Sequence, residues 1–118
     1  MIKKITLLTF ILSLSFYGHT DNLKKLKVPK NFEIDIISEN LDSPRQMAET
    51  MNGHIIVGSK KGSEVIALID KNKNGSYEKR IVANDLKNPA GVVIYEGDLY
   101  FAEMDTVWII KNIDAWLN

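Results

Sequence analysis

Cysteine is absent from this 118-residue chain, and neither sign of charge is in excess. Without cysteine there is no disulfide, no thiolate metal ligand, no cysteine nucleophile and no sulfur for a lipid anchor. Fifteen Lys and Arg side chains balance fifteen Asp and Glu side chains. Net charge therefore gives no reason to expect a nucleic acid or an anionic membrane surface as a partner.

The first twenty residues differ in character from the rest. Lys3 and Lys4 precede an uncharged apolar run over residues 5–17. A run of about 13 residues is shorter than the roughly 20 that span a bilayer. A basic start followed by such a run is typical of a secretory signal peptide. We therefore expect a signal peptide over residues 1–20, a periplasmic or secreted protein and no stable membrane anchor after cleavage; an uncleaved anchor or a buried helix is the alternative.

Helical periodicity is also scarce, and short apolar segments separated by turns fill the remaining sequence. Residues 21–30 are a basic lead-in, and residues 31–38 alternate apolar and acidic side chains as a half-buried strand does. Residues 112–118 could start a helix capped by Asn112 or Asp114. The other expected strands cover residues 46–51, 54–59, 64–70, 77–83, 91–95, 99–103 and 107–112.

These turns and strands recur in one order at an offset of about 42–45 residues. The recurring pairs are Leu41 and Leu86, Pro44 and Pro89, Gly53 and Gly97, Val57 and Phe101, and Val65 and Val107. A period of 40–50 residues that carries four strands is typical of β-propeller blades. A blade cannot bury both of its faces alone and needs a neighbour built to the same plan.

The sequence thus predicts an all-β fold of four-stranded antiparallel β-propeller blades, incomplete in this chain. Within residues 31–118 we expect a strand over 31–38 that belongs to a ring-closing blade, a blade over 46–83 and an incomplete blade over 90–118. Fewer than two complete blades cannot close a ring, so the remaining blades are needed as partners. Alone, the chain would expose two apolar faces and unpaired sheet edges. A small β-sandwich with an accidental repeat is the alternative.

The same segments resemble a known family, the soluble quinoprotein glucose and sorbosone dehydrogenases. The resemblance rests on "LDSPRQMA", "GHIIVGSKKGSEVIALID", "KNKNGSYEKRIVANDLKNPAGVVIYEGDLYFAE" and "DTVWIIKNID". It implies a six-bladed propeller, and an exported enzyme that oxidises an aldose with pyrroloquinoline quinone (PQQ) and calcium. Ala90 and Gly91 stand where the family more often has asparagine and glycine, and Gln46 replaces a usual glycine. Lactonase-like calcium-dependent hydrolases and non-catalytic propellers that bind a partner or a sugar are the alternatives.

Two charged residues are the candidates for cofactor binding. Arg45 follows the turn that enters an innermost strand, and Glu103 ends the second strand of the incomplete blade. No catalytic residue is assigned. The resemblance implies a histidine base, but His19 lies in the expected signal peptide and we expect His54, after an Asn-Gly turn, to be solvated. We therefore expect the fragment alone to be inactive.

A candidate calcium site lies in the loop after residue 69. Asp70, Asn72 and Asn74 match the first half of an EF-hand loop, in which alternate oxygen side chains converge on calcium. The twelfth position of the loop is Ile81 instead of the usual glutamate. We expect either a weak structural calcium site or a polar hairpin loop that binds no metal.

Overall fold

A computed structural model of the protein describes residue 23 and residues 25–118, so the expected signal peptide lies outside the described residues. The chain divides into two compact units, the first ending at Asp35 and the second spanning Ile36–Asn118. In the first unit the amide of Phe32 donates a hydrogen bond to the carbonyl of Pro29, which closes a turn. None of the described helices is long and apolar enough to cross a membrane.

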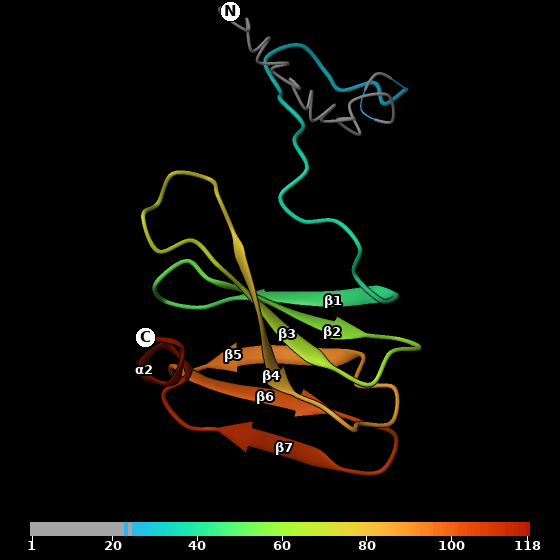
Figure 1. Ribbon diagram of the computed structural model, residues 1–118, viewed down its shortest axis with the longest axis vertical. Coiled ribbons are helices and arrows are strands. Elements are labelled where there is room, and N and C mark those ends of the chain that lie inside the picture. The colour runs from blue at the N-terminus through green and yellow to red at the C-terminus, as the bar shows by residue number, and fades with distance from the viewer. Residues whose placement is uncertain (1–22, 24) are drawn as a thin grey trace, which may run out of the picture. The chain divides into compact units, whose positions relative to one another are not determined.

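The second unit contains two antiparallel sheets and one short helix (Figure 1). Sheet A has the strand order β1-β2-β3-β4, and sheet B has the order β5-β6-β7. The bounds are β1 Pro44–Glu49, β2 Ile55–Ser59, β3 Val65–Ile69, β4 Glu78–Ala83, β5 Gly91–Tyr95, β6 Asp98–Ala102, β7 Val107–Ile110 and α2 Ile113–Leu117. The all-β class and the two antiparallel groups of strands are confirmed. The side chain of Asn112 caps α2 by accepting a hydrogen bond from the amide of Ala115.

The strand expected over residues 31–38 is not present, and this segment belongs to neither sheet. Its apolar side chains are exposed, with Phe32 at 68%, Ile34 at 43% and Ile36 at 38%. Alternation gives a segment the pattern of a strand, but a strand forms only against a partner edge. The two sheets of the described residues do not supply that edge to it.

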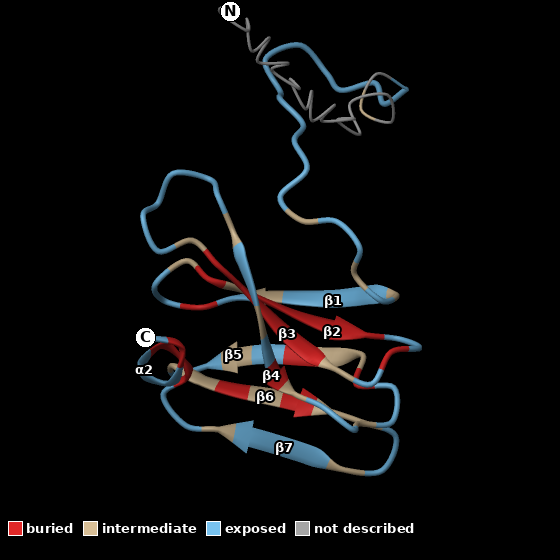
Figure 2. Cartoon of the chain, viewed as in Figure 1, coloured by how far each residue is buried: buried red, intermediate tan, exposed pale blue. Residues whose placement is uncertain are grey.

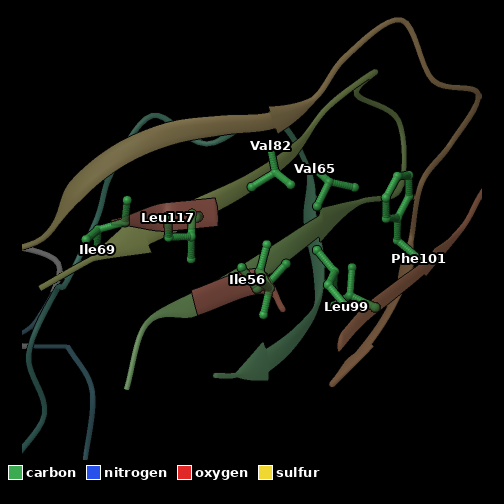
Figure 3. Close-up of a cluster of buried hydrophobic side chains, with 10 residues drawn as sticks. Ile56, Val65, Ile69, Val82, Leu99, Phe101 and Leu117 are labelled. Carbon is green, nitrogen blue, oxygen red and sulfur yellow. The ribbon is translucent and has the colours of Figure 1, made fainter. Parts of the chain in front are cut away.

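Cross-strand pairing fixes which residues share a face of each sheet. Ala48 pairs with Ile56, and Ile56 pairs with Ala67, so these three residues share one face of sheet A. In sheet B, Val92 pairs with Phe101 in the same way. These two faces meet in one core, to which α2 also contributes (Figure 3). We call the face of each sheet that points into this core its inner face, and the opposite face its outer face. Its buried members are Ile56, Val65, Ala67, Ile69, Val82, Val92, Leu99, Phe101, Ile113 and Leu117.

The two outer faces differ. On sheet A, the side chains of Val57, Ile66 and Leu68 form a second buried cluster, against which Leu41 and Tyr77 pack. On sheet B the outer face carries several exposed residues, and β7 is exposed over most of its length (Figure 2). Its exposed apolar side chains are Val93 at 53%, Tyr95 at 61%, Val107 at 72% and Ile109 at 42%. Of the two open faces that the sequence predicts, the one on sheet A is therefore mostly closed by the chain's own loops.

The internal repeat shows that the two sheets stack in the same sense, which means that equivalent faces of the two sheets point in the same direction. The inner face of sheet A corresponds by the repeat offset to the outer face of sheet B. The corresponding pairs are Ala48 and Val93, Ile56 and Tyr100, and Ala67 and Ile109. Non-equivalent faces thus meet between the sheets, and the interface is heterologous. A sandwich of two equivalent halves would instead bring equivalent faces together.

At Gly58 the backbone of sheet A lies close to the backbone of Pro89 and Ala90, just before β5. The amide of Ser59 donates a hydrogen bond to the carbonyl of Pro89 at 2.9 Å, and the amide of Val92 donates to Oε1 of Gln46 at 3.2 Å. A Cβ atom on Gly58 would lie 2.6 Å from the carbonyl oxygen of Pro89. Only glycine allows this approach without a shift of the backbone.

We expect Gly58→Ala to lower the free energy of unfolding by about 1–3 kcal/mol, because the added methyl group overlaps backbone atoms that cannot rotate away. Urea unfolding followed by circular dichroism measures this change. Gly91→Ala is the matched control, since a Cβ atom there meets its nearest neighbour, Oε1 of Gln46, at 3.6 Å. Equal effects of the two substitutions would contradict the proposed close approach.

Candidate functional site

Four loops gather at one end of the two sheets, which we call the proline end. They cover residues 42–44, 60–64, 84–90 and 103–106. The amide of Leu86 donates to the carbonyl of Ser63 at 3.0 Å, and the amide of Met104 donates to the carbonyl of Lys87 at 3.2 Å. These bonds tie the connection between the sheets to loops of both. Both candidate cofactor residues belong to this end.

Arg45 lies at the start of β1 and is exposed. It forms no ion pair with any residue that the structure describes. Lys60 and Lys61, in the loop after β2, and Lys87, in the connection between the sheets, are exposed at the same end. Pro44 pairs with Ser59 at the end of β2, and Arg45 lies in the irregular stretch of the ladder between Pro44 and Met47. The proline end therefore offers several solvated cations from sheet A and from the connection between the sheets.

Glu103 is half-buried at the end of β6, and both of its carboxylate oxygens accept hydrogen bonds from the chain itself. Oε2 accepts from the amide of Lys87 at 2.7 Å, and Oε1 accepts from Nε1 of Trp108 at 3.0 Å. The amide of Glu103 donates to the carbonyl of Thr106 at 3.0 Å. This side chain thus fixes the β6–β7 turn to the connection between the sheets. The structure places Arg45 and Glu103 at one end but gives no contact between them.

The candidate calcium loop lies at the opposite end, which we call the hairpin end and which contains residues 50–54, 70–77, 95–98 and α2. Oδ1 of Asp70 accepts from the amide of Asn74 at 3.1 Å, and Oδ2 accepts from the amide of Gly75 at 2.8 Å. Oδ1 of Asn74 accepts from the amide of Ser76 at 3.0 Å, while Asn72 is exposed. The oxygens of Asp70 and Asn74 are thus turned onto the loop's own amides. Within the described residues, no group of three His, Asp or Glu side chains is arranged to hold a metal ion.

His54 is buried, with 6% of its surface exposed, so the expectation that it is solvated is wrong. Its amide donates to Oγ1 of Thr50 at 3.1 Å, but Nδ1 of its ring is buried without a hydrogen-bond partner. The turn before it is held by α2, because Oδ2 of Asp114 accepts from the amide of Asn52 at 3.2 Å. An Asn-Gly turn gives no sign that a helix sixty residues later will cover it.

His54 also lines a cavity of about 320 Å³ at the hairpin end. The other lining residues are Asn52, Ile69, Asp70, Lys71, Lys73, Leu117 and Asn118. Lys71 is bound to Glu78, with its Nζ 3.0 Å from Oε2 of the carboxylate. Asp114, a candidate cap of the C-terminal helix in the sequence analysis, is also buried, and its Oδ1 has no hydrogen-bond partner.

Comparisons with known proteins assign no family to the chain. No family model matches it, and no solved structure matches it. A protein of Borreliella burgdorferi that is described only as uncharacterized is 29% identical over 94 residues. The match covers 79% of this chain and 23% of that protein. The chain therefore spans about a quarter of the length of the curated relative that it matches.

We expect Glu103→Ala to lower the free energy of unfolding by about 1–2 kcal/mol, because it leaves two donors without a charged acceptor. Urea unfolding measures the loss, and the emission of Trp108 should shift to longer wavelength as the indole loses its partner. Asp105→Ala is the control in the same turn, where the carboxylate accepts a hydrogen bond from the hydroxyl of Thr106. A loss no larger than that of the control would contradict a fixing role for Glu103.

The carboxylate of Asp70 provides a test by pH. The hydrogen bond from the amide of Gly75 is the largest cause that holds the pKa of Asp70 below its ordinary value, and the amide of Asn74 adds to it. The ionised Asp70 carboxylate therefore stabilises the folded loop fully above the pKa that Asp70 has in the unfolded chain. This stabilisation is lost as the pH falls through the lower pKa that Asp70 has in the folded chain. NMR titration should show the amides of Asn74 and Gly75 moving with the Asp70 carboxyl at that low midpoint.

A midpoint at or above that of an ordinary aspartate would contradict these bonds. Titration with Ca²⁺ at neutral pH separates the two interpretations of the loop. A saturable shift of the Asn74 and Gly75 amides would show a metal site instead of a loop closed on itself.

Proposed function

We propose that the chain forms two neighbouring blades in the N-terminal part of an exported β-propeller, and that this propeller oxidises an aldose with PQQ. The observation that carries the blade arrangement is the same-sense stacking of sheet A and sheet B, and the sugar chemistry rests on the sequence resemblance. A heterologous interface does not end with two members, and it generates a ring when the rotation per member closes. A four-stranded meander repeated in this sense is the construction of a propeller.

Two further features support a ring. The first strands of the two sheets are neighbours, since Gln46 of β1 accepts a hydrogen bond from Val92 of β5. First strands line the central channel when blades are arranged around an axis. The relative from Borreliella burgdorferi has more than four times as many residues as align with this chain. That length leaves room for further blades in one polypeptide.

The proline end fits the anionic groups of PQQ in part. Arg45, Lys60, Lys61 and Lys87 are exposed cations there, and they would hold the carboxylates of the cofactor by charge-assisted hydrogen bonds. Glu103 would act indirectly, by fixing Lys87 and the turn beside it. Bound PQQ supplies the hydride acceptor. The described residues contain neither a group for its calcium ion nor an assigned base, so we assign both to other blades.

The activity test uses the full-length protein, reconstituted with PQQ and Ca²⁺. It should reduce an artificial electron acceptor when an aldose is added, and the 118-residue chain alone should not. Arg45→Ala should raise the PQQ concentration for half-maximal activity at least tenfold. Lys73→Ala, which removes an exposed cation at the opposite end, is the control and should leave it unchanged. Hydrolysis of a lactone with Ca²⁺ and without PQQ would instead show that the protein is a calcium-dependent lactonase-like hydrolase.

A further inference from the structure

The sequence contains two Asn-Gly pairs, Asn52-Gly53 and Asn74-Gly75. In such a pair the backbone nitrogen of glycine can attack the side-chain amide carbon of asparagine, because glycine has no side chain to hinder the approach. Ammonia leaves, and a succinimide ring forms. Water then opens the ring to an aspartyl or isoaspartyl residue, so the chain gains a negative charge. The reaction needs no enzyme and no co-reactant except water.

Both pairs lie at the hairpin end, but different groups hold them. The amide of Gly53 donates to the carbonyl of Thr50 at 3.0 Å, and the amide of Asn52 donates to Oδ2 of Asp114 at 3.2 Å. The first pair is thus held by its own turn and by α2. The second pair lies in a loop that is exposed over residues 71–76, where the carboxylate of Asp70 holds the backbone.

The amide of Gly75 provides the nucleophile of the second pair, and the carboxylate of Asp70 binds it. Oδ2 of Asp70 accepts from this amide at 2.8 Å, and Oδ1 accepts from the amide of Asn74 at 3.1 Å. Hydrogen bonds to a charged acceptor are stronger than those between neutral groups. The nitrogen must lose its proton to attack, and a negative charge beside it opposes that loss. The bond therefore slows formation of the succinimide.

The side-chain amide of Asn74, which is the group under attack, is activated. Its Oδ1 accepts a hydrogen bond from the amide of Ser76 at 3.0 Å. This bond spans Gly75 and folds the Asn74 side chain back over the following backbone. It also polarises the side-chain carbonyl, which makes the carbon a better electrophile. The second pair thus combines an activated carbon with a restrained nitrogen.

We propose that Asn74 is a site of spontaneous deamidation and that the carboxylate of Asp70 sets its rate by holding the amide of Gly75. Asp70 is a positioning residue in this reaction. The bond from Gly75 is the largest cause that keeps the pKa of Asp70 below its ordinary value, so the carboxylate is charged and the restraint is present at neutral pH. The proposal depends neither on the blade arrangement nor on the sugar chemistry.

The test follows both Asn-Gly pairs in one molecule by mass spectrometry of peptides, after incubation of the chain at mildly alkaline pH. The rate at each pair is divided by its rate in urea, which removes the effect of local sequence. Asp70→Ala frees the amide of Gly75, and we expect Asn74 to react about tenfold faster, the effect of losing a hydrogen bond to a charged group. Asn52 keeps its bonds and should react as before.

Glu78→Ala is the matched control. It also removes a carboxylate beside this loop and breaks the ion pair with Lys71, whose Nζ lies 3.0 Å from Oε2 of Glu78, but it leaves the bond from Gly75 in place. It should change the rate at Asn74 by less than about twofold, because an exposed ion pair contributes little. Asp70→Asn keeps an acceptor oxygen without the charge and should give an intermediate rate.

Three results would overturn the proposal. Equal rates at Asn74 in the native chain and in both Asp70 variants would show that the bond from Gly75 does not control the reaction. Equal acceleration by Asp70→Ala and Glu78→Ala would show that general loosening of the loop controls it. Equal acceleration at Asn52 and Asn74 in both Asp70 variants would show that unfolding of the hairpin end controls it.

Discussion

The contact between the inner faces of sheet A and sheet B is the interaction on which the rest of the structure depends. Ile56, Leu99 and Ile113 are fully buried in this contact. Each such side chain contributes about 1.5–3 kcal/mol relative to full exposure. The close approach at Gly58 and the helix α2 limit how the two sheets can be placed. The geometry of both ends of the molecule follows from this placement.

The two ends of the sheets have different roles. At the proline end, loops of both sheets are tied together by backbone bonds and by Glu103, and exposed cations surround them. At the hairpin end, α2 covers a turn and buries His54 and Asp114. The loop of Asp70 at the other end uses its carboxylate to hold its own backbone.

The same-sense stacking leaves the molecule asymmetric. On one side the outer face of sheet A is closed by Leu41 and Tyr77, and on the other the outer face of sheet B and the edge of β7 are open. An open stack built on a heterologous contact presents one unused half of that contact at each end. The exposed apolar residues of sheet B are a consequence of this constraint.

The sequence by itself determined the positions of all seven strands to within about two residues, because turns with Asn-Gly, Pro and Gly and short apolar runs act over neighbouring residues. It also determined the repeat. Only the tertiary structure decided which faces meet, that His54 is buried, that Glu103 holds Lys87 and Trp108, and that residues 31–38 join neither sheet. Each of these depends on contacts between residues far apart in the chain, which local patterns do not encode.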